Sequence, residues 1–378
     1  MPPERDAYRF FDAFRFLAAL VVLFGHARAA LWVDPDQAVA LSWWAKSVYF
    51  VAGLGHPAVM VFFVLSGFWI THTVERLAQH ERFWAEYLTD RLSRLLIVIL
   101  PALLVGGALD LAGAGLFDGA IYFDRLGAHN VFKNVYDCLT PAVFLGNLVF
   151  LQGFTSVPPF GSNTPLWSLA FEFWYYVWFA ALALAARRLF SPALLSLALA
   201  LLSPRLAAGF LVWLAGSMLF YADRRHDARA MPRVSRARGF LVGGGFALLA
   251  ALVAARLHWL AQPLSDFLVG VSFAGFAWGL LRGAVRFPTR VLPLLSRYGA
   301  QASFSLYVIH YPLIYFSVSA AGLRQRQQPG LGPLAEIVLL CALAILCGWL
   351  FSKATEANTS RLRRRLKQHW RKEELTGS

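Results

Sequence analysis

Charged residues are scarce in this chain, where they make up 15% of 378 residues while hydrophobic residues make up 58%. A composition this apolar excludes a soluble domain and is typical of a polytopic membrane protein. Acidic residues are scarcer than basic ones, because 21 aspartates and glutamates stand against 35 lysines and arginines. The basic residues lie in short loops between apolar segments, which argues against nucleic-acid binding and indicates a membrane topology with its positive side inside.

Cysteine is also rare, with only Cys138, Cys341 and Cys347 in the chain. Their spacing fits neither a zinc site nor a disulfide framework. Internal repeats are lacking too, which argues against separate repeated domains. We therefore predict no metal site and no permanently bound cofactor. The chain is expected to form one integral domain over residues 1–356, followed by a short basic tail over 357–378.

Long apolar runs are what the sequence has in abundance, and they predict an all-α bundle of about ten transmembrane helices. The expected spans cover approximately residues 10–32, 55–74, 95–112, 166–186, 191–203, 206–221, 239–256, 263–281, 299–320 and 334–352. The fifth is shorter than the roughly 17–25 residues that a span usually needs. A further apolar run at 141–151 fits a re-entrant or interfacial segment.

The strongly basic loops all fall on one side of the membrane when the ten spans are counted in order. These loops are residues 75–94, 187–188, 222–238, 282–297 and the tail. The N-terminus falls on the same side. Because cytoplasmic loops carry the excess of lysine and arginine, we predict that both termini are cytoplasmic.

The first span carries two polar residues, Arg15 and His26, in the run FDAFRFLAALVVLFGHA. A cation within a span is costly, so it is rarely there without a function. The two residues are eleven apart. Eleven helical steps of about 100° make three turns plus about 20°, which places both on one face. The alternatives are a snorkelling arginine at the cytoplasmic edge and a histidine that forms a structural hydrogen bond between helices.

The fourth span carries Glu172, about one and a half turns inside its outer boundary. An intramembrane carboxylate needs a partner, and His26 lies at a comparable depth. We predict that Glu172 orients the His26 imidazole, as a carboxylate does in a hydrolase triad. A structural ion pair is the alternative.

Two arginines precede the third span, and they suit a phosphate group because arginine binds phosphate through two hydrogen bonds. They are Arg91 and Arg94, three residues apart and therefore neighbours on a helix. Lipid headgroups are the alternative partner. A polar path through the spans is expected to use Ser66, Trp167, Ser168, Tyr307 and His310. Close helix packing at Ser66-Gly67, and satisfaction of the backbone disrupted by Pro312, are the alternatives there.

Taken together, these motifs resemble the membrane acyltransferase-3 family, whose members O-acylate sugars and some antibiotics. The matching segments are Arg15 with His26, FFVLSGF at 62–68, Arg91 with Arg94, LWSLAFEFWYY at 166–176 and SFSLYVIHYP at 303–312. The resemblance covers nearly the whole chain in order. One position departs from the pattern: family members often have proline three residues after the second arginine, whereas this chain has Ile97 there and Pro101 further on.

The resemblance implies transfer of an acyl group, most often acetyl, from cytoplasmic acyl-CoA to a hydroxyl of an envelope or exported glycan. His26 would act as general base or transient acyl carrier, with Glu172 positioning it. Arg15, Arg91 and Arg94 would anchor the CoA phosphates. The expected partners are acyl-CoA, a glycan or lipid-linked oligosaccharide, and membrane lipids. The expected location is the inner membrane of a bacterium.

Three alternatives stay open at this stage. Intramembrane Arg, His and Glu also suit a proton-coupled transporter or flippase for a lipid or glycan, although no inverted repeat is present. A second alternative is that the acyl acceptor is a small molecule such as a macrolide, and not a glycan. A membrane-bound O-acyltransferase of the lipid-modifying type would need a histidine and an asparagine deep in later spans, and His310 has no such asparagine near it in sequence.

Overall fold

The computed structural model describes residues 6–117, 119–127, 133–153, 155–185, 197–198, 203–227, 234–282 and 291–376. Within these ranges the regular structure is helical, and the one β-type pairing is an isolated bridge between Trp32 and Gln327. The all-α class predicted from the apolar runs is therefore confirmed.

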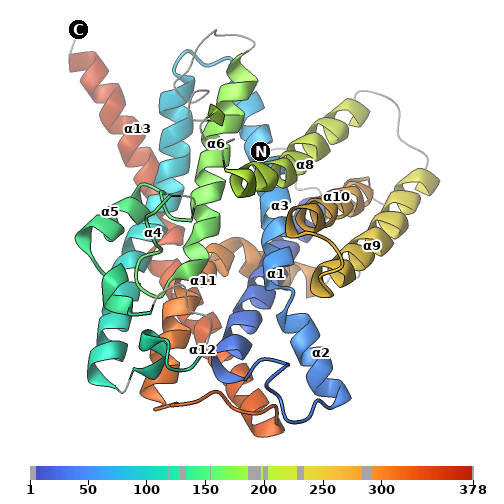
Figure 1. The fold of residues 1–378 in the computed structure, drawn as a ribbon. Coiled ribbons are helices and arrows are strands. Elements are labelled where there is room, and N and C mark those ends of the chain that lie inside the picture. Colours follow the sequence, from blue (N-terminus) through green and yellow to red (C-terminus); the bar gives the residue numbers. More distant parts are fainter. Residues whose placement is uncertain are drawn as a thin grey trace. The chain divides into compact units, whose positions relative to one another are not determined.

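The helices follow one another along the chain as labelled in Figure 1. They are α1 (Asp6–Leu31), α2 (Trp43–Ala52), α3 (Gly55–Leu77), α4 (Phe83–Leu116), η1 (Ala120–Phe123), η2 (Val135–Cys138), α5 (Pro141–Leu148), η3 (Thr164–Leu166), α6 (Trp167–Ala185), α8 (Pro204–Asp227), α9 (Val234–Arg256), α10 (Gln262–Leu281), α11 (Val291–Ala320), α12 (Leu331–Ala354), η4 (Glu356–Asn358) and α13 (Thr359–Thr376).

Eight helices in the described part of the chain are long and apolar enough to cross a membrane. They correspond to all the predicted spans except the fifth and the ninth. The predicted fifth span, 191–203, lies almost entirely outside the described residues. The ninth corresponds to α11, which has the required length, but its serines, tyrosines and His310 make it less apolar than the eight.

One boundary differs from the sequence-based expectation. Helix α4 begins at Phe83, twelve residues before the predicted third span, because the amphipathic segment before the span contains no helix breaker. Both Arg91 and Arg94 therefore lie inside α4. The run at 141–151 forms α5, whose eight residues reach only about 12 Å, well short of the roughly 30 Å of a hydrocarbon core. Helix α2 was not expected, because it lies between the predicted first and second spans.

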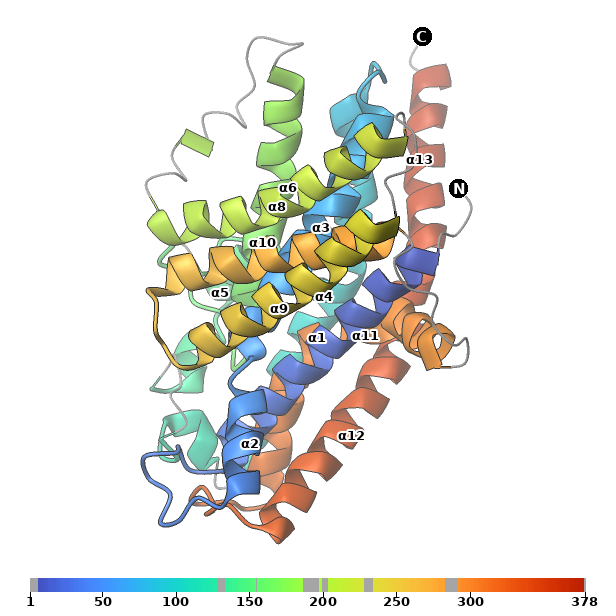
Figure 2. The same ribbon diagram turned by 90° about the vertical axis from the view of Figure 1, so that its right-hand side faces the viewer.

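The chain forms two compact units. Unit 1 consists of Met1–Gly25, Lys46–Glu75 and Phe171–Ala300, and unit 2 consists of His26–Ala45, Arg76–Ala170 and Gln301–Ser378. In unit 1, α10 packs between α8 and α9, and the three run side by side in both views (Figure 1, Figure 2).

Helices α3 and α8 of unit 1 cross with their backbones in contact. A Cβ atom on Gly67 would collide with the carbonyl oxygen of Trp213, and one on Gly216 would collide with that of Val64. Only glycine, which has no side chain, permits this approach. The glycine of the FFVLSGF motif thus serves close helix packing, which was the structural alternative considered for Ser66-Gly67.

Unit 2 is built around α11. Ser319 Oγ on α11 donates to the carbonyl oxygen of Gly113 on α4 at 2.7 Å. On another part of α11, Leu306 fills the space beside Gly348 of α12, where a Cβ atom would meet the Leu306 backbone. Helix α13 lies alongside α4 (Figure 1). These contacts hold the central turn of α11, which carries His310, within a packed group of helices.

Candidate functional site

The two intramembrane histidines of unit 2 form a pair. His26 Nδ1 on α1 lies 2.9 Å from His310 Nε2 on α11, and the rings are nearly parallel, with an interplanar angle of 4°. His310 is buried, with 1% of its surface exposed, whereas His26 is half-buried. The Tyr311 ring contacts His26 edge-on, with ring centroids 4.8 Å apart. His310 is therefore closed off from solvent, whereas part of His26 is exposed.

The positions of the protons on the two rings follow from the backbone carbonyl groups that His310 contacts. His310 Nδ1 lies 2.8 Å from the carbonyl oxygen of Tyr307 and 3.2 Å from that of Leu306. A carbonyl oxygen only accepts hydrogen bonds, so His310 Nδ1 carries the proton and Nε2 of the neutral ring is an acceptor. His26 Nδ1 must then donate to His310 Nε2. The remaining nitrogen of neutral His26, Nε2, keeps its lone pair and can act as base or nucleophile.

Pro312 disrupts α11 one turn after Val308, and this was the structural alternative considered for His310. Proline has no N–H group, so the carbonyl oxygen four residues before it loses its helical donor. That oxygen belongs to Val308, and it accepts a hydrogen bond from Asn163 Nδ2 at 2.7 Å. Asn163, and not His310, satisfies the disrupted backbone. The Nε2 atom of His310 is therefore available to His26.

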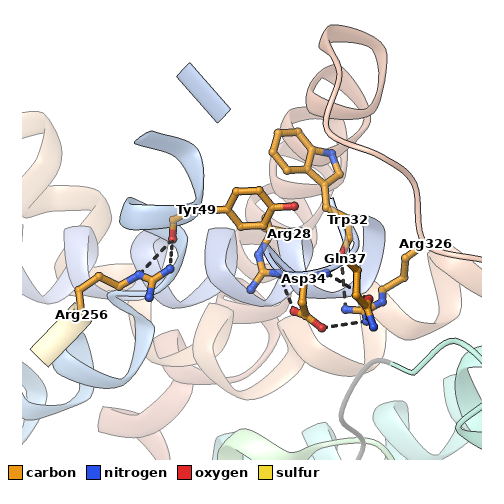
Figure 3. A network of polar contacts seen from close by, with 7 residues as sticks. All are labelled: Arg28, Trp32, Asp34, Gln37, Tyr49, Arg256 and Arg326. Atoms are coloured by element: carbon orange, nitrogen blue, oxygen red, sulfur yellow. Dashed lines mark hydrogen bonds and ion pairs between the residues drawn. The ribbon is translucent and has the colours of Figure 1, made fainter. Parts of the chain in front are cut away.

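The loops that follow α1 and α11 are joined by a half-buried charge cluster (Figure 3). Asp34 accepts from Arg28 Nη1 at 3.3 Å and pairs with Arg326 Nη2 at 2.8 Å. Arg326 also donates to the carbonyl oxygen of Trp32 at 3.4 Å. The cluster ties the end of α1 to the segment after α11. Since these helices carry the two histidines, the charge cluster restrains the pair.

Arg256, also drawn in Figure 3, separately donates to the carbonyl oxygen of Tyr49 in unit 1.

Two predicted path residues bond to each other in unit 2. Ser168 Oγ lies 2.6 Å from the Tyr307 hydroxyl, and both groups also lie within hydrogen-bond distance of the Pro165 carbonyl oxygen, at 3.1 and 3.2 Å. Both residues are buried. Their hydroxyls therefore hold the start of α6 against α11. Trp167, the first residue of α6, is half-buried.

Glu172 in unit 1 ends a chain of hydrogen bonds. Trp213 Nε1 donates to Ser66 Oγ at 3.3 Å, and Ser66 Oγ donates to the Tyr176 hydroxyl at 3.4 Å. The Tyr176 hydroxyl donates to Glu172 Oε1 at 2.5 Å. Ser66, expected on the substrate path, thus belongs to the support of Glu172. Since Glu172 and His26 lie in different units, their pairing stays a prediction.

The predicted phosphate anchors are distributed over α1 and α4. Arg15 pairs with Asp12 at 3.6 Å, one turn earlier on α1. On α4, Asp90 lies four residues before Arg94, a spacing that favours a helical ion pair. Asp90 is buried and is instead contacted by Lys367 Nζ at 2.8 Å and Arg363 Nε at 3.4 Å, both on α13. Helix α13 thus compensates the carboxylate beside the arginine pair.

Other chemistries find less support. Within the described ranges, no group of three histidine, cysteine or acidic side chains is placed to hold a metal ion. Burial raises the pKa of the Cys138 thiol, with the nearby Asp137 acting in the same direction, so this cysteine stays protonated. A protonated thiol is a poor nucleophile, which leaves the histidine pair as the better candidate for group transfer.

Sequence reasoning missed several of these residues. Asn163, Asp34 and Arg326 lie in loops without a motif, and Tyr311 is one of many aromatic residues. The available signal for Asn163 was Pro312, since an intrahelical proline requires a donor from elsewhere for the carbonyl that it leaves unpaired. His310 was identified, but as part of a path and not as the partner of His26.

The eight apolar helices long enough to cross a membrane define a polytopic integral membrane protein, and its unit 2 contains the His26–His310 pair. The family model described as an acyltransferase domain matches residues 8–353. The chain therefore belongs to the acyltransferase-3 family, as its motifs predicted, and is a membrane acyltransferase. Comparison with curated proteins finds no match, and comparison with solved structures finds none either.

Proposed function

We propose that this acyltransferase moves an acetyl group from acyl-CoA on the cytoplasmic side to a hydroxyl of a cell-envelope or exported polysaccharide, such as an exopolysaccharide or lipopolysaccharide sugar. The observation that carries the proposal is the His26–His310 pair, which leaves one unprotonated imidazole nitrogen on the half-buried His26 of α1. O-acylation needs a base or nucleophile of this kind, because the hydroxyl of a sugar is a weak nucleophile while it keeps its proton.

In the direct route, His26 Nε2 removes the proton from the acceptor hydroxyl while its oxygen attacks the thioester carbonyl carbon. The carbon–sulfur bond then breaks, and the departing CoA thiolate takes the proton from His26. Throughout, His26 Nδ1–H continues to donate to His310 Nε2, so the imidazolium stays oriented. In the covalent route, Nε2 itself attacks the thioester carbonyl carbon, the carbon–sulfur bond breaks, and CoA leaves as the thiolate. The sugar oxygen then attacks the acyl carbon, the nitrogen–carbon bond breaks, and the thiolate takes up the hydroxyl proton, so that His26 becomes neutral again.

Arginine side chains supply the proposed anchor for the donor. The CoA nucleotide carries several phosphate charges, and Arg91 and Arg94 share one stretch of α4 at the end of the basic loop 75–94. Arg15 is the third member of this set. The basic loops are on the side assigned to the cytoplasm, where acyl-CoA is found. Glu172 remains the proposed second acid–base group, held by Tyr176. We propose no permanently bound cofactor, because acyl-CoA is a co-substrate.

The first experiment separates transfer from transport. Protein reconstituted in liposomes is given acetyl-CoA with and without glycan acceptor, and free CoA thiol is measured together with the mass of the glycan. We expect CoA release that depends on acceptor, and a gain of one acetyl group per transfer. Acceptor movement across the membrane without thiol release would contradict the proposal and favour a transporter. Mass spectrometry of envelope glycans from a deletion strain then identifies the natural acceptor.

A second experiment tests the anchor. Arg94→Ala should raise the KM for acetyl-CoA about tenfold or more, as expected for one charge-assisted hydrogen bond to phosphate, with kcat nearly unchanged. Arg238→Ala is the matched control, because Arg238 is exposed in the first turns of α9, at the end of a basic segment of the same predicted side, but belongs to unit 1. Equal KM changes in the two variants would mean that Arg94 contributes only general positive charge.

A further inference from the structure

Two buried asparagines of unit 2 differ in how completely their side chains are satisfied. Asn147 is 0% exposed and Asn163 is 2% exposed. Asn147 Nδ2 donates to the carbonyl oxygens of Val143 at 2.8 Å and Pro158 at 2.9 Å, and its Oδ1 accepts from Phe160 N at 3.1 Å. Asn147 therefore has both ends of its carboxamide bonded, as buried polar groups usually do.

Asn163 has only one end bonded. Its Nδ2 donates to the carbonyl oxygen of Val308, whereas its Oδ1 is buried and has no hydrogen-bond partner within the described part of the chain. The amide cannot be turned over to relieve this, because Val308 presents a carbonyl oxygen and only Nδ2 can donate to it. A buried acceptor without a donor costs about 1–3 kcal/mol, so its retention calls for an explanation.

Neighbouring side-chain donors are already committed. Ser162 donates from both its backbone nitrogen and its hydroxyl to Asp110, at 2.7 and 2.8 Å. The Ser168 hydroxyl on α6 and the Tyr307 hydroxyl on α11 bond to each other and to the Pro165 carbonyl oxygen. These hydroxyls leave the Asn163 oxygen to a donor from elsewhere.

The position of this oxygen links it to the histidine pair. Val308, which the Asn163 amide contacts, lies two residues before His310 on α11. Two residues of α-helix rise about 3 Å and turn about 200°, so the carboxamide and the His310 ring lie at nearly the same height along α11 but on different sides of it. A group bound by Asn163 Oδ1 would therefore lie at the level of the proposed reaction centre, about one helix width from it.

We infer that Asn163 Oδ1 is a substrate-binding acceptor that receives a hydrogen bond from an O–H or N–H group of a bound substrate. The inference rests on the proposed function, because that function brings two molecules with such groups to the site. They are the sugar, through its hydroxyls, and the pantetheine arm of acyl-CoA, through its amide N–H groups. Asn163 would hold one part of an extended bound molecule at the level of the His26–His310 pair and would take no part in proton transfer.

The experiment compares three variants by steady-state kinetics, with acetyl-CoA and glycan varied separately, and by thermal unfolding. Asn163→Leu removes both ends of the amide. Asn163→Asp keeps an acceptor oxygen but loses the donor to Val308. Asn147→Leu is the control, because it removes a fully bonded buried amide from the same segment.

We expect Asn163→Leu to raise one KM about tenfold, as the loss of one substrate hydrogen bond predicts. Asn163→Asp should lower the unfolding temperature as much or more, yet keep that KM within about threefold of the wild type, because its oxygen still accepts. Asn147→Leu should lower the unfolding temperature and leave both KM values near those of the wild type. An increase for acetyl-CoA identifies the pantetheine amide as the donor, and an increase for the glycan identifies the sugar hydroxyl.

Unchanged KM values in folded Asn163→Leu would overturn the inference, and so would equal KM changes in Asn163→Leu and Asn147→Leu. Binding of a hydrolysis-resistant thioether analogue of acetyl-CoA, together with binding of the glycan, separates this outcome from failure of the proposed function. A wild-type protein that binds both but transfers nothing would refute the proposed function. Weaker binding of either molecule to Asn163→Leu would still support the assignment of Asn163, and unchanged binding of both would refute it.

Discussion

The polar groups of the two units are organised in opposite directions. In unit 1 the donors run from Trp213 through Ser66 and Tyr176 and end on the carboxylate of Glu172. In unit 2 the donors run from His26 through His310 and end on backbone carbonyls. The first arrangement holds a negative charge in place. The second leaves an unprotonated nitrogen at its beginning, so it is the better candidate for the reacting base.

The largest loss of activity is expected when the proposed base, His26, is removed. His26→Ala should lower acetyl transfer by at least about 10³-fold, because both the direct and the covalent route use its Nε2 atom. Acetylated glycan is measured in cells, at membrane abundance matched to the wild type. Full activity in this variant would show that the base lies elsewhere. Labelling with radioactive acetyl-CoA without acceptor adds a distinction, since a His26-dependent acetyl-protein is formed in the covalent route only.

The next largest effect is expected at the partner histidine. His310→Ala removes the acceptor for His26 Nδ1–H and should reduce kcat about 10²-fold, because the reacting ring is no longer fixed in one tautomer. His310→Gln should recover activity to within about tenfold of the wild type, since its side-chain oxygen can accept the same proton. If Gln and Ala are equally inactive, His310 has a role other than accepting this hydrogen bond.

A smaller effect is expected in unit 1. Tyr176→Phe removes the donor to Glu172 and should reduce kcat about threefold to tenfold, the range expected for losing one hydrogen bond to a carboxylate. Ser66→Ala is the control and should change kcat by less than about threefold, because its two bonds are long, at 3.3 and 3.4 Å. A larger loss in Tyr176→Phe than in His310→Ala would reverse the ranking of the two regions.

The sequence predicts the helices well because a membrane imposes a simple rule, namely that an apolar run of sufficient length forms a helix. The beginning of α4 was predicted too late, since hydropathy marks where a helix enters the membrane and not where the helix begins. Helix α13, by contrast, was expected only as a short basic tail. Its contact with Asp90 required the folded arrangement.

The site was predictable in its composition but not in its pairing. The spacing of Arg15 and His26 singled out α1 as a candidate site helix, and SFSLYVIHYP singled out His310. Their contact joins residues 284 positions apart, which no local pattern reveals. Asn163 was harder to predict, because it lies in a loop and its backbone partner Val308 is 145 residues away. The sequence shows that Pro312 leaves a carbonyl oxygen without its helical donor. It does not show that Asn163 supplies the replacement donor.

The crossing of α3 and α8 has a consequence for mutational scanning. Replacing a residue by alanine is normally read as the loss of a side chain, but at Gly67 and Gly216 it adds an atom where two backbones already touch. The added methyl group would act as a wedge between the helices, and Ser66 and Trp213 beside it would move apart. Inactivity at these two positions in an alanine scan would therefore report a displaced helix, even though neither glycine contributes a chemical group.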